Sequence, residues 1–246
     1  MKKAIKLLAL LFAFVMVVGC FAGCGSKSSD LQAVKDADKL VVGVTVYPPM
    51  DYLNDDGEWT GFDAELAQMF ADELGVNCQI VIITWANKVA ELNSKQIDFS
   101  VSYAKNAQVA VVKKGSALTA DGVKDATIAV EGGSAGATVA EETIKGTKIN
   151  KVTAQVDALG EVLAGTSDVA IVDITMAQSV VGKGAYADLE VLSGASYGDE
   201  IFAVGLRKGS DLKAELDSFL KAKYADGTLG QLAEKYSVGL NEDALK

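Results

Sequence analysis

The sequence predicts an α/β fold in which short β-strands alternate with amphipathic helices. Short runs rich in Val, Ile and Ala recur along the chain, and between them apolar residues return every three or four positions. The first pattern is typical of buried strands, and the second is typical of helices that cover a sheet. The chain of 246 residues is long enough for one large domain or for two modest lobes.

The predicted elements begin with a strand at 40–44, where every residue except Gly43 is apolar. A helix is predicted after Gly61, because apolar side chains then recur at every fourth position and form one buried stripe. These positions are Phe62, Leu66, Phe70 and Leu74. The next predicted elements are a strand at 79–83, a helix at 86–92 and a strand at 107–112.

A second α/β unit is predicted from residue 126 onward. Its predicted elements are strands at 126–130, 169–172 and 201–206, and helices at 135–144, 154–163 and 174–181. Two C-terminal helices follow. The first is expected to be capped by Ser210 and to bury Leu212, Leu216 and Leu220, and the second runs from 229 to 236. This alternation predicts the fold class and leaves the strand order open.

The N-terminus has the pattern of a lipoprotein signal peptide over residues 1–23. Three lysines precede an apolar stretch from 7 to 19, which is shorter than the roughly 20 residues of a membrane span. The sequence Phe-Ala-Gly-Cys then resembles a lipobox with Cys24 as the lipidated residue, and Cys20 is the alternative acceptor. A plain secretory signal with incidental cysteines is the other interpretation. Residues 24–37 are expected to form a flexible tether, because Gly and Ser dominate its start.

The composition argues against several classes of function. The net charge of −10 disfavours a nucleic-acid partner and an electrostatic attachment to anionic lipid. The sequence contains no histidine, and histidine is the commonest general base and zinc ligand, so neither an enzyme nor a metal or other cofactor is expected. Apart from the two lipobox candidates, Cys78 is the one cysteine. We therefore expect no internal disulfide and a small buried side chain at that position.

Several blocks of sequence share their order and spacing with a known family. They are LVVGV at 40–44, YPPM at 47–50, DGEWTGFD at 56–63, the segment from Trp85 to Asp98, IAVEGGS at 128–134, DVAIVD at 168–173 and LRKGSDL at 206–212. Together they resemble the bacterial extracellular solute-binding proteins of family 3, which serve ABC transporters of polar amino acids. The resemblance covers nearly all of residues 38–240.

The resemblance implies a two-lobed periplasmic-binding-protein fold of type II, with two hinge strands and a ligand cleft between the lobes. Lobe 1 is then expected to contain 38–103 and 200–246, and lobe 2 to contain 104–199. The implied partners are an amino acid or a similar small zwitterion, an ABC permease with its ATPase, and a membrane reached through the lipid anchor. The family also implies a monomer on the outer face of the cytoplasmic membrane or in the periplasm.

The same resemblance suggests where the charged and apolar parts of the ligand bind. Asp173 matches the aspartate that binds the ligand ammonium, which needs a partner when it is buried. It follows an apolar strand, at the end where α/β sheets present ligand groups, although it also stands where it can cap the next helix. Tyr47 and Trp85 match positions whose rings pack against the ligand side chain, with an ordinary core tryptophan as the alternative for Trp85.

The turn Gly133-Ser134-Ala135 leads into a predicted helix. Its backbone N–H groups and the positive end of the helix are expected to hold the ligand carboxylate. The alternative is a simple turn in which Ser134 only caps the helix. Glu131 stands where relatives carry other polar residues, so it is expected to tune the preference for the ligand side chain.

The sequence departs from the family pattern after Asp98. Relatives continue through a strand, a loop and a helix start that carries an arginine, whereas here Asp98 runs directly into Phe99. This implies an internal deletion that removes the family's bidentate partner of the α-carboxylate. The remaining arginine, Arg207, matches no ligand position. Losing such a partner costs roughly 2–5 kcal/mol, so a micromolar binder is expected to weaken to about 0.1 mM or beyond.

The leading hypothesis is therefore a binding protein without catalytic residues, which supplies an amino-acid importer. One alternative is an enzyme on the same scaffold, resembling dehydratases or lytic transglycosylases, with Asp98, Glu131 and Asp173 as candidate acids. The other is an orphan extracellular amino-acid sensor, which differs from the importer subunit only in its partner.

Overall fold

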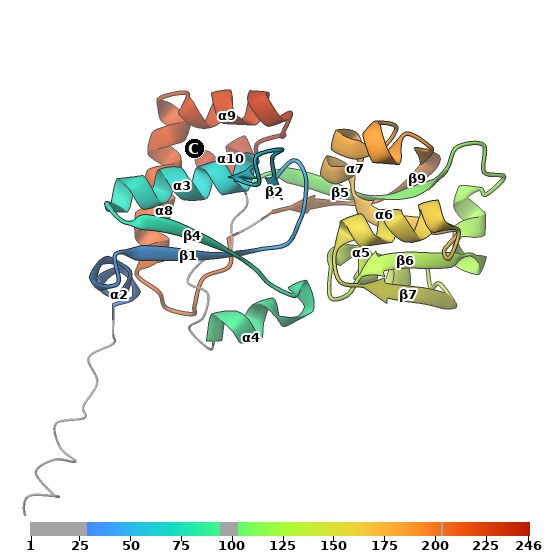
Figure 1. Ribbon diagram of the computed structural model, residues 1–246, viewed down its shortest axis with the longest axis horizontal. Helices are drawn as coiled ribbons and strands as arrows, with labels where there is room; N and C mark the ends of the chain where they lie inside the picture. The colour runs from blue at the N-terminus through green and yellow to red at the C-terminus, as the bar shows by residue number, and fades with distance from the viewer. Residues whose placement is uncertain (1–28, 94–102, 203) are drawn as a thin grey trace, which may run out of the picture.

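The computed structural model describes residues 29–93, 103–202 and 204–246, and it consists of two lobes joined by extended strands (Figure 1). The predicted signal peptide with Cys20 and Cys24, and the departure after Asp98, lie outside the described residues. Within those residues, no helix is both long and apolar enough to cross a membrane.

We call lobe 1 the part built around the parallel strands β1 (Lys39–Val44) and β4 (Asn77–Ile82). Its helices are α2 (Asp30–Asp36), α3 (Phe62–Leu74), α4 (Lys88–Asn93), α8 (Leu212–Ala225), α9 (Thr228–Tyr236) and α10 (Glu242–Leu245). The short strands β2 (Tyr52–Leu53) and β3 (Trp59–Thr60) pair antiparallel. Phe62, Leu66 and Phe70 of the predicted stripe are buried in the core against α8, so this helix was predicted correctly.

Lobe 2 contains a five-stranded sheet in the order β7-β6-β8-β5-β9. The strands are β5 (Lys105–Lys113), β6 (Thr127–Glu131), β7 (Lys148–Val152), β8 (Val169–Asp173) and β9 (Leu189–Ile201). Helices α5 (Ala135–Thr138), α6 (Gln155–Ala164) and α7 (Ile174–Val180) connect them. Alternate residues of β5 enter two different cores, Val109 and Val111 on one face and Ala110 and Val112 on the other, as the two-residue period of a strand requires.

The sheet of lobe 2 is mixed rather than parallel. β6 pairs in parallel with β7 and β8, whereas β5 pairs antiparallel with both β8 and β9. β5 and β9 also carry the chain between the lobes. Lys105 pairs with Ile201 at the end of this ribbon, and just beyond it the Phe202 N–H donates to the Ala104 carbonyl at 2.8 Å. Ala104 is fully buried in the core of lobe 1, so the ribbon joins the two cores directly.

Several predicted boundaries were wrong. Of the predicted strand at 201–206, only Ile201 belongs to a strand, as the last residue of β9. The rest of β9 was missed because of its polar composition and its glycines at irregular points of the pairing. β7 was missed because it is short and half polar. The predicted helix at 135–144 divides into α5 and a π-helical turn, Val139–Thr143, and a 3₁₀ turn, Trp85–Asn87, precedes α4.

Two smaller expectations also need correction. Asp211 rather than Ser210 occupies the N-cap position of α8. Cys78 is only partly buried, although it packs against the lobe 1 core, and burial raises the pKa of its thiol to about 11.

The segment 24–37 is not flexible throughout, because α2 occupies Asp30–Asp36 and is fastened to lobe 1. The Ser29 hydroxyl caps this helix by accepting the Gln32 N–H at 2.9 Å. Arg207 binds Asp30 at 2.8 Å, with both side chains 14% exposed. The Leu31 N–H donates to the Asp211 carboxylate at 2.9 Å. These contacts hold the N-terminal helix against the start of α8.

Removing the Arg207–Asp30 ion pair should loosen α2. Because the pair is largely shielded from solvent, we expect Asp30→Asn to lower the free energy of unfolding by about 1–3 kcal/mol, between the values for exposed and buried pairs. Urea denaturation measures this loss. The matched control is Asp217→Asn, which removes an exposed i,i+4 pair with Lys213 and should cost less than about 0.5 kcal/mol. Equal losses in the two variants would contradict the clamp.

Candidate functional site

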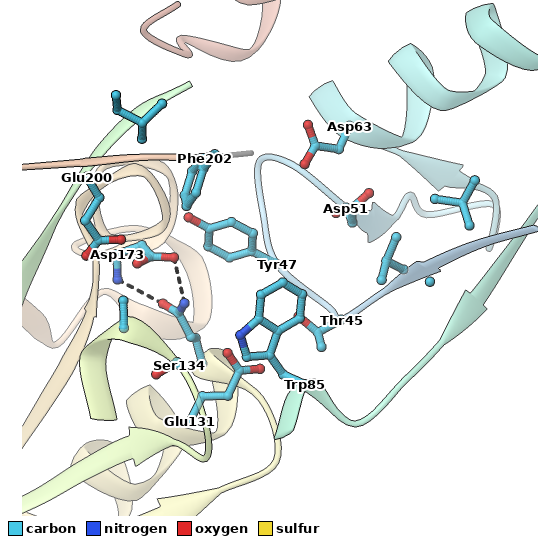
Figure 2. Close-up of a pocket in the computed structure, with 16 residues that line it drawn as sticks. Thr45, Tyr47, Asp51, Asp63, Trp85, Glu131, Ser134, Asp173, Glu200 and Phe202 are labelled. Atoms are coloured by element: carbon cyan, nitrogen blue, oxygen red, sulfur yellow. Dashed lines mark hydrogen bonds between the residues drawn. The ribbon is translucent and has the colours of Figure 1, made fainter. Parts of the chain in front are cut away.

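A cavity of about 240 Å³ lies between the two lobes. Lobe 1 contributes the end of β1, the loop that follows it and the start of α3, and lobe 2 contributes the ends of β6, β8 and β9 (Figure 2). The cavity thus lies beside the ribbon of β5 and β9 that joins the lobes. Residues that are far apart in the sequence meet here because four strands end at this point.

The structure brings most of the predicted site residues to this one cavity. Tyr47, Trp85, Ser134, Ala135 and Asp173 all line it. Gly133 does not line it but lies at its rim, against Ala86 of lobe 1. The candidate acid Asp98 lies outside the described residues.

Asp173 is held in place by three side-chain amides. Its Oδ1 accepts hydrogen bonds from Asn106 at 2.8 Å and from Gln108, and its Oδ2 accepts one from Gln155 at 2.7 Å. Gln155 also accepts the Asp173 backbone N–H at 2.9 Å. These donors replace the hydrogen bonds that the buried carboxylate would otherwise make with water. Asp173 stands at the N-cap position of α7 without a side-chain capping bond, so its carboxylate is turned to the amides and the cavity instead.

Aromatic rings form the wall of the cavity on the lobe 1 side. The Tyr47 ring packs against the cores of both lobes and meets Phe202 edge to face, with centroids 6.0 Å apart. Burial and the nearby Asp173 carboxylate raise the pKa of the Tyr47 hydroxyl well above its ordinary value. Trp85 is half-buried and belongs to none of the core clusters of the described residues, which disfavours a purely structural role.

The two lobes touch beside Trp85. The Lys88 ammonium lies 4.7 Å from the centroid of the Trp85 ring and donates to the Gly133 carbonyl of lobe 2 at 3.0 Å. Burial lowers the pKa of Lys88. Gly133 has a φ of +74°, and a Cβ atom there would lie 3.0 Å from the Ala86 Cα. Glycine is therefore required for both the turn and the contact.

The turn at 133–135 keeps both of its predicted roles open. Ser134 does cap α5, because its hydroxyl accepts the Ala137 N–H at 3.1 Å. The Ser134 N–H donates to the Glu131 carbonyl at 3.2 Å, so an anion would have to use the N–H groups at the very start of α5, which have no acceptor within the helix.

Sequence reasoning missed three acidic residues of the cavity, Asp51, Asp63 and Glu200. Asp51 and Asp63 are buried near one another on the lobe 1 side (Figure 2). Burial raises the pKa of Asp51 to about 8, and burial together with Asp51 raises the pKa of Asp63 well above its ordinary value. Glu200 shares the amides of Gln108, at 2.8 Å, and Asn106 with Asp173.

Glu131, which was expected to influence ligand preference, also lines the cavity. It is 3% exposed, and burial and the Asp173 carboxylate raise its pKa to about 8. Among the described residues, no cluster of His, Cys, Asp and Glu is arranged to hold a metal ion. The site is therefore an acidic, aromatic cavity, and its chemistry suits an organic molecule that carries positive charge.

The comparisons with known proteins agree with this geometry. The model of the bacterial extracellular solute-binding proteins, family 3, matches residues 40–239. The L-cystine-binding protein TcyJ of Escherichia coli is 31% identical over 90% of this chain and 92% of its own length.

Solved structures of amino acid-binding proteins have the same fold. A variant of ArgBP from T. maritima superposes with a TM-score of 0.77 and 26% identity, covering 84% of this chain and 98% of its own. An ancestral amino acid-binding protein, described as a precursor of cyclohexadienyl dehydratase, gives a TM-score of 0.76 and 26% identity, covering 85% and 99%.

Replacing Gly133 should separate the lobes. Gly133→Ala is expected to cost about 1–2 kcal/mol of stability for the positive φ and also to push Ala86 away. Gly75→Ala is the matched control, because Gly75 has a φ of +73° and open space around it. We expect similar losses in urea denaturation, but a larger radius of gyration by X-ray scattering for Gly133→Ala alone. Equal radii would show that the contact is not needed.

The buried pair Asp51 and Asp63 should make stability depend on pH. A raised pKa means that the folded chain keeps a proton which the unfolded chain releases, so the free energy of unfolding falls between about pH 4 and about pH 8. Asp51→Asn should flatten this fall by on the order of 1 kcal/mol per pH unit. Urea denaturation across this range tests it, with the exposed Asp125→Asn as control. Parallel curves for Asp51→Asn and wild type would contradict the assignment.

Proposed function

Because the chain belongs to the bacterial extracellular solute-binding proteins of family 3, we propose that it is the substrate-binding component of an ABC importer for an amino acid or a similar small zwitterion. The observation that carries the proposal is the Asp173 carboxylate, fixed by three amides in a cavity that it shares with two aromatic rings. A buried ammonium group needs a fixed carboxylate of this kind.

The proposed assignment of the cavity follows from its contacts. Asp173, with Glu200 beside it, receives the α-ammonium group, since both carboxylates face the same amides. Tyr47 and Trp85 pack against the ligand side chain. The turn Gly133-Ser134-Ala135 offers backbone N–H groups to the α-carboxylate. Solved relatives that bind arginine, glutamine and histidine share this fold.

Transport follows from closure of the two lobes on the ligand. In the proposal, residues 1–23 are the signal peptide, Cys24 carries the lipid, and the closed form of the monomer docks on a permease with its ATPase outside the cytoplasmic membrane. The proposed bounds are 38–103 and 200–246 for lobe 1, against whose core α2 and Ala104 also pack, and 104–199 for lobe 2. The hinge then lies at the β5–β9 ribbon. The contact of Lys88 with Gly133 then stabilises the closed arrangement.

The affinity is proposed to be modest. The cavity is lined by no basic residue among the described ones, and the single arginine of the chain is paired with Asp30. The α-carboxylate thus lacks the bidentate partner that Arg supplies elsewhere in the family. A dissociation constant of about 0.1 mM or weaker follows from a loss of roughly 2–5 kcal/mol.

A second candidate function is catalysis on the same scaffold. Glu131 has a pKa of about 8 and lies in the cavity, as a general acid near neutral pH should. One similar structure is described as a precursor of cyclohexadienyl dehydratase. Conversion of a prephenate-like substrate by the wild type, abolished in Glu131→Gln, would favour this function. An orphan sensor differs from the importer subunit only in its partner.

The proposal predicts that amino acids stabilise the protein. Ligand at about 100 times its dissociation constant, here about 10 mM, should add about 2.7 kcal/mol to the free energy of unfolding, visible in a thermal-shift screen of the L-amino acids. Asp173→Asn should weaken the tightest of these ligands at least about 30-fold by calorimetry. The exposed Asp125→Asn should bind as the wild type does. A flat screen at this concentration would refute the proposal.

A further inference from the structure

Glu131 is a buried acid on the lobe 2 side of the cavity that has an unpartnered oxygen, as Asp51 and Asp63 also have on the lobe 1 side. It ends β6, is 3% exposed and is directed into the cavity (Figure 2). Its Oε1 atom is fully buried and has no hydrogen-bond partner among the described residues. A buried oxygen in this state loses the hydrogen bonds that water would make, so it calls for a partner that the folded chain does not provide.

The other acids of the cavity differ from Glu131 in the side chains that lie beside them. Asp173 and Glu200 accept hydrogen bonds from the amides of Asn106 and Gln108. Asp51 and Asp63 each keep a buried Oδ1 without a hydrogen-bond partner, but they lie near one another, and burial together with Asp51 raises the pKa of Asp63 well above its ordinary value. On the lobe 2 side, Glu131 is thus the acid whose buried Oε1 lacks a partner within the described residues.

The lining offers Glu131 no counter-ion. All the charged residues that line the cavity are acids. Lys88, the basic group that acts on Glu131, does not line the cavity, and its ammonium donates to the carbonyls of Trp85 and Gly133, at 3.4 and 3.0 Å. A cationic group on the ligand therefore meets only acids among the charged residues of the lining, while the Lys88 ammonium lies over the Trp85 ring and is held by backbone carbonyls.

We infer that Glu131 is the receptor for a second cationic nitrogen of the ligand, so that the site selects amino acids with a positively charged side chain over those with a neutral one. This inference rests on the proposed function, in which Asp173 receives the α-ammonium group. The two carboxylates then hold opposite ends of a ligand that carries two separate positive charges.

The magnitudes permit this role. With a pKa of about 8, Glu131 must lose a proton to bind a cation, which costs about tenfold in affinity at neutral pH. A cation in contact lowers the pKa of a carboxyl by about 1–3 units, which matches or exceeds that cost. The charged groups that face Glu131 are Asp173, Lys88 and Asp157, and all three also face a neutral ligand of the same shape.

The test compares two pairs of ligands of similar shape, L-arginine with L-citrulline and L-lysine with L-norleucine, by calorimetry. We expect the cationic member of each pair to bind at least about tenfold more tightly, which is about 1.4 kcal/mol. Glu131→Gln should remove this preference and leave the neutral members unchanged within about twofold. The preference for arginine should also grow as the pH rises from about 6.5 to about 8.5, because binding releases the Glu131 proton.

Glu141→Gln is the matched control, since Glu141 lies on the surface of lobe 2 in a pair with Lys151 and should leave all four affinities unchanged. Glutamine nearly preserves the shape of glutamate, and urea denaturation without ligand verifies that Glu131→Gln folds. Equal binding of arginine and citrulline, or an unchanged preference in Glu131→Gln, would overturn the inference alone.

A diamine separates the inference from the proposed function. Cadaverine carries two ammonium groups and no carboxylate. If it binds through Glu131 while no amino acid binds, the receptor role of Glu131 is retained and the amino-acid assignment fails. If neither cadaverine nor any amino acid binds, both fail together.

Discussion

The structure depends on keeping a negative charge in a cavity between two lobes. Asp173 provides that charge, and the amides of Asn106, Gln108 and Gln155 compensate for the water it loses. The amides come from β5 and α6, so the Asp173 carboxylate has all three donors only when both elements pack beside β8. The mixed sheet of lobe 2 therefore also determines the position of the hydrogen-bond donors of the site. Its antiparallel β5, which also leads into lobe 1, places the donors of the site at the point where the lobes join.

The sequence predicted the fold class and many elements, because β1, β6 and β8 are apolar and α3 has a clear stripe. β9 and α2 were not predicted because long-range contacts stabilise them. β9 pairs with β5, and α2 is held by Arg207 and Asp211. The same reason applies to the site. A family resemblance pointed to Asp173, Tyr47 and Trp85, but Gln108 acquires its role only from the register that sets it opposite Asp173. No local sequence pattern predicts that Gln108 and Asp173 lie opposite one another.

The buried acids of the cavity lower the stability of the protein as the pH rises, but they favour the binding of a cation. Asp51, Asp63 and Glu131 are all buried, and burial raises the pKa of each. Each group favours the folded chain less as the pH rises, because the unfolded chain gives up the proton more readily. A positively charged ligand reverses this effect, since it stabilises the ionised form in place. The acids that lower the stability of the protein at high pH are thus the ones that can bind a cationic ligand.

The fastening of α2 has a mechanical consequence for the whole molecule. Arg207 and Asp211 hold this helix to the start of α8, so the chain upstream of Ser29 departs from one lobe at a fixed point. Any movement of the lobes at the β5–β9 ribbon would leave this junction unchanged, because α2 and α8 both pack into the core of lobe 1.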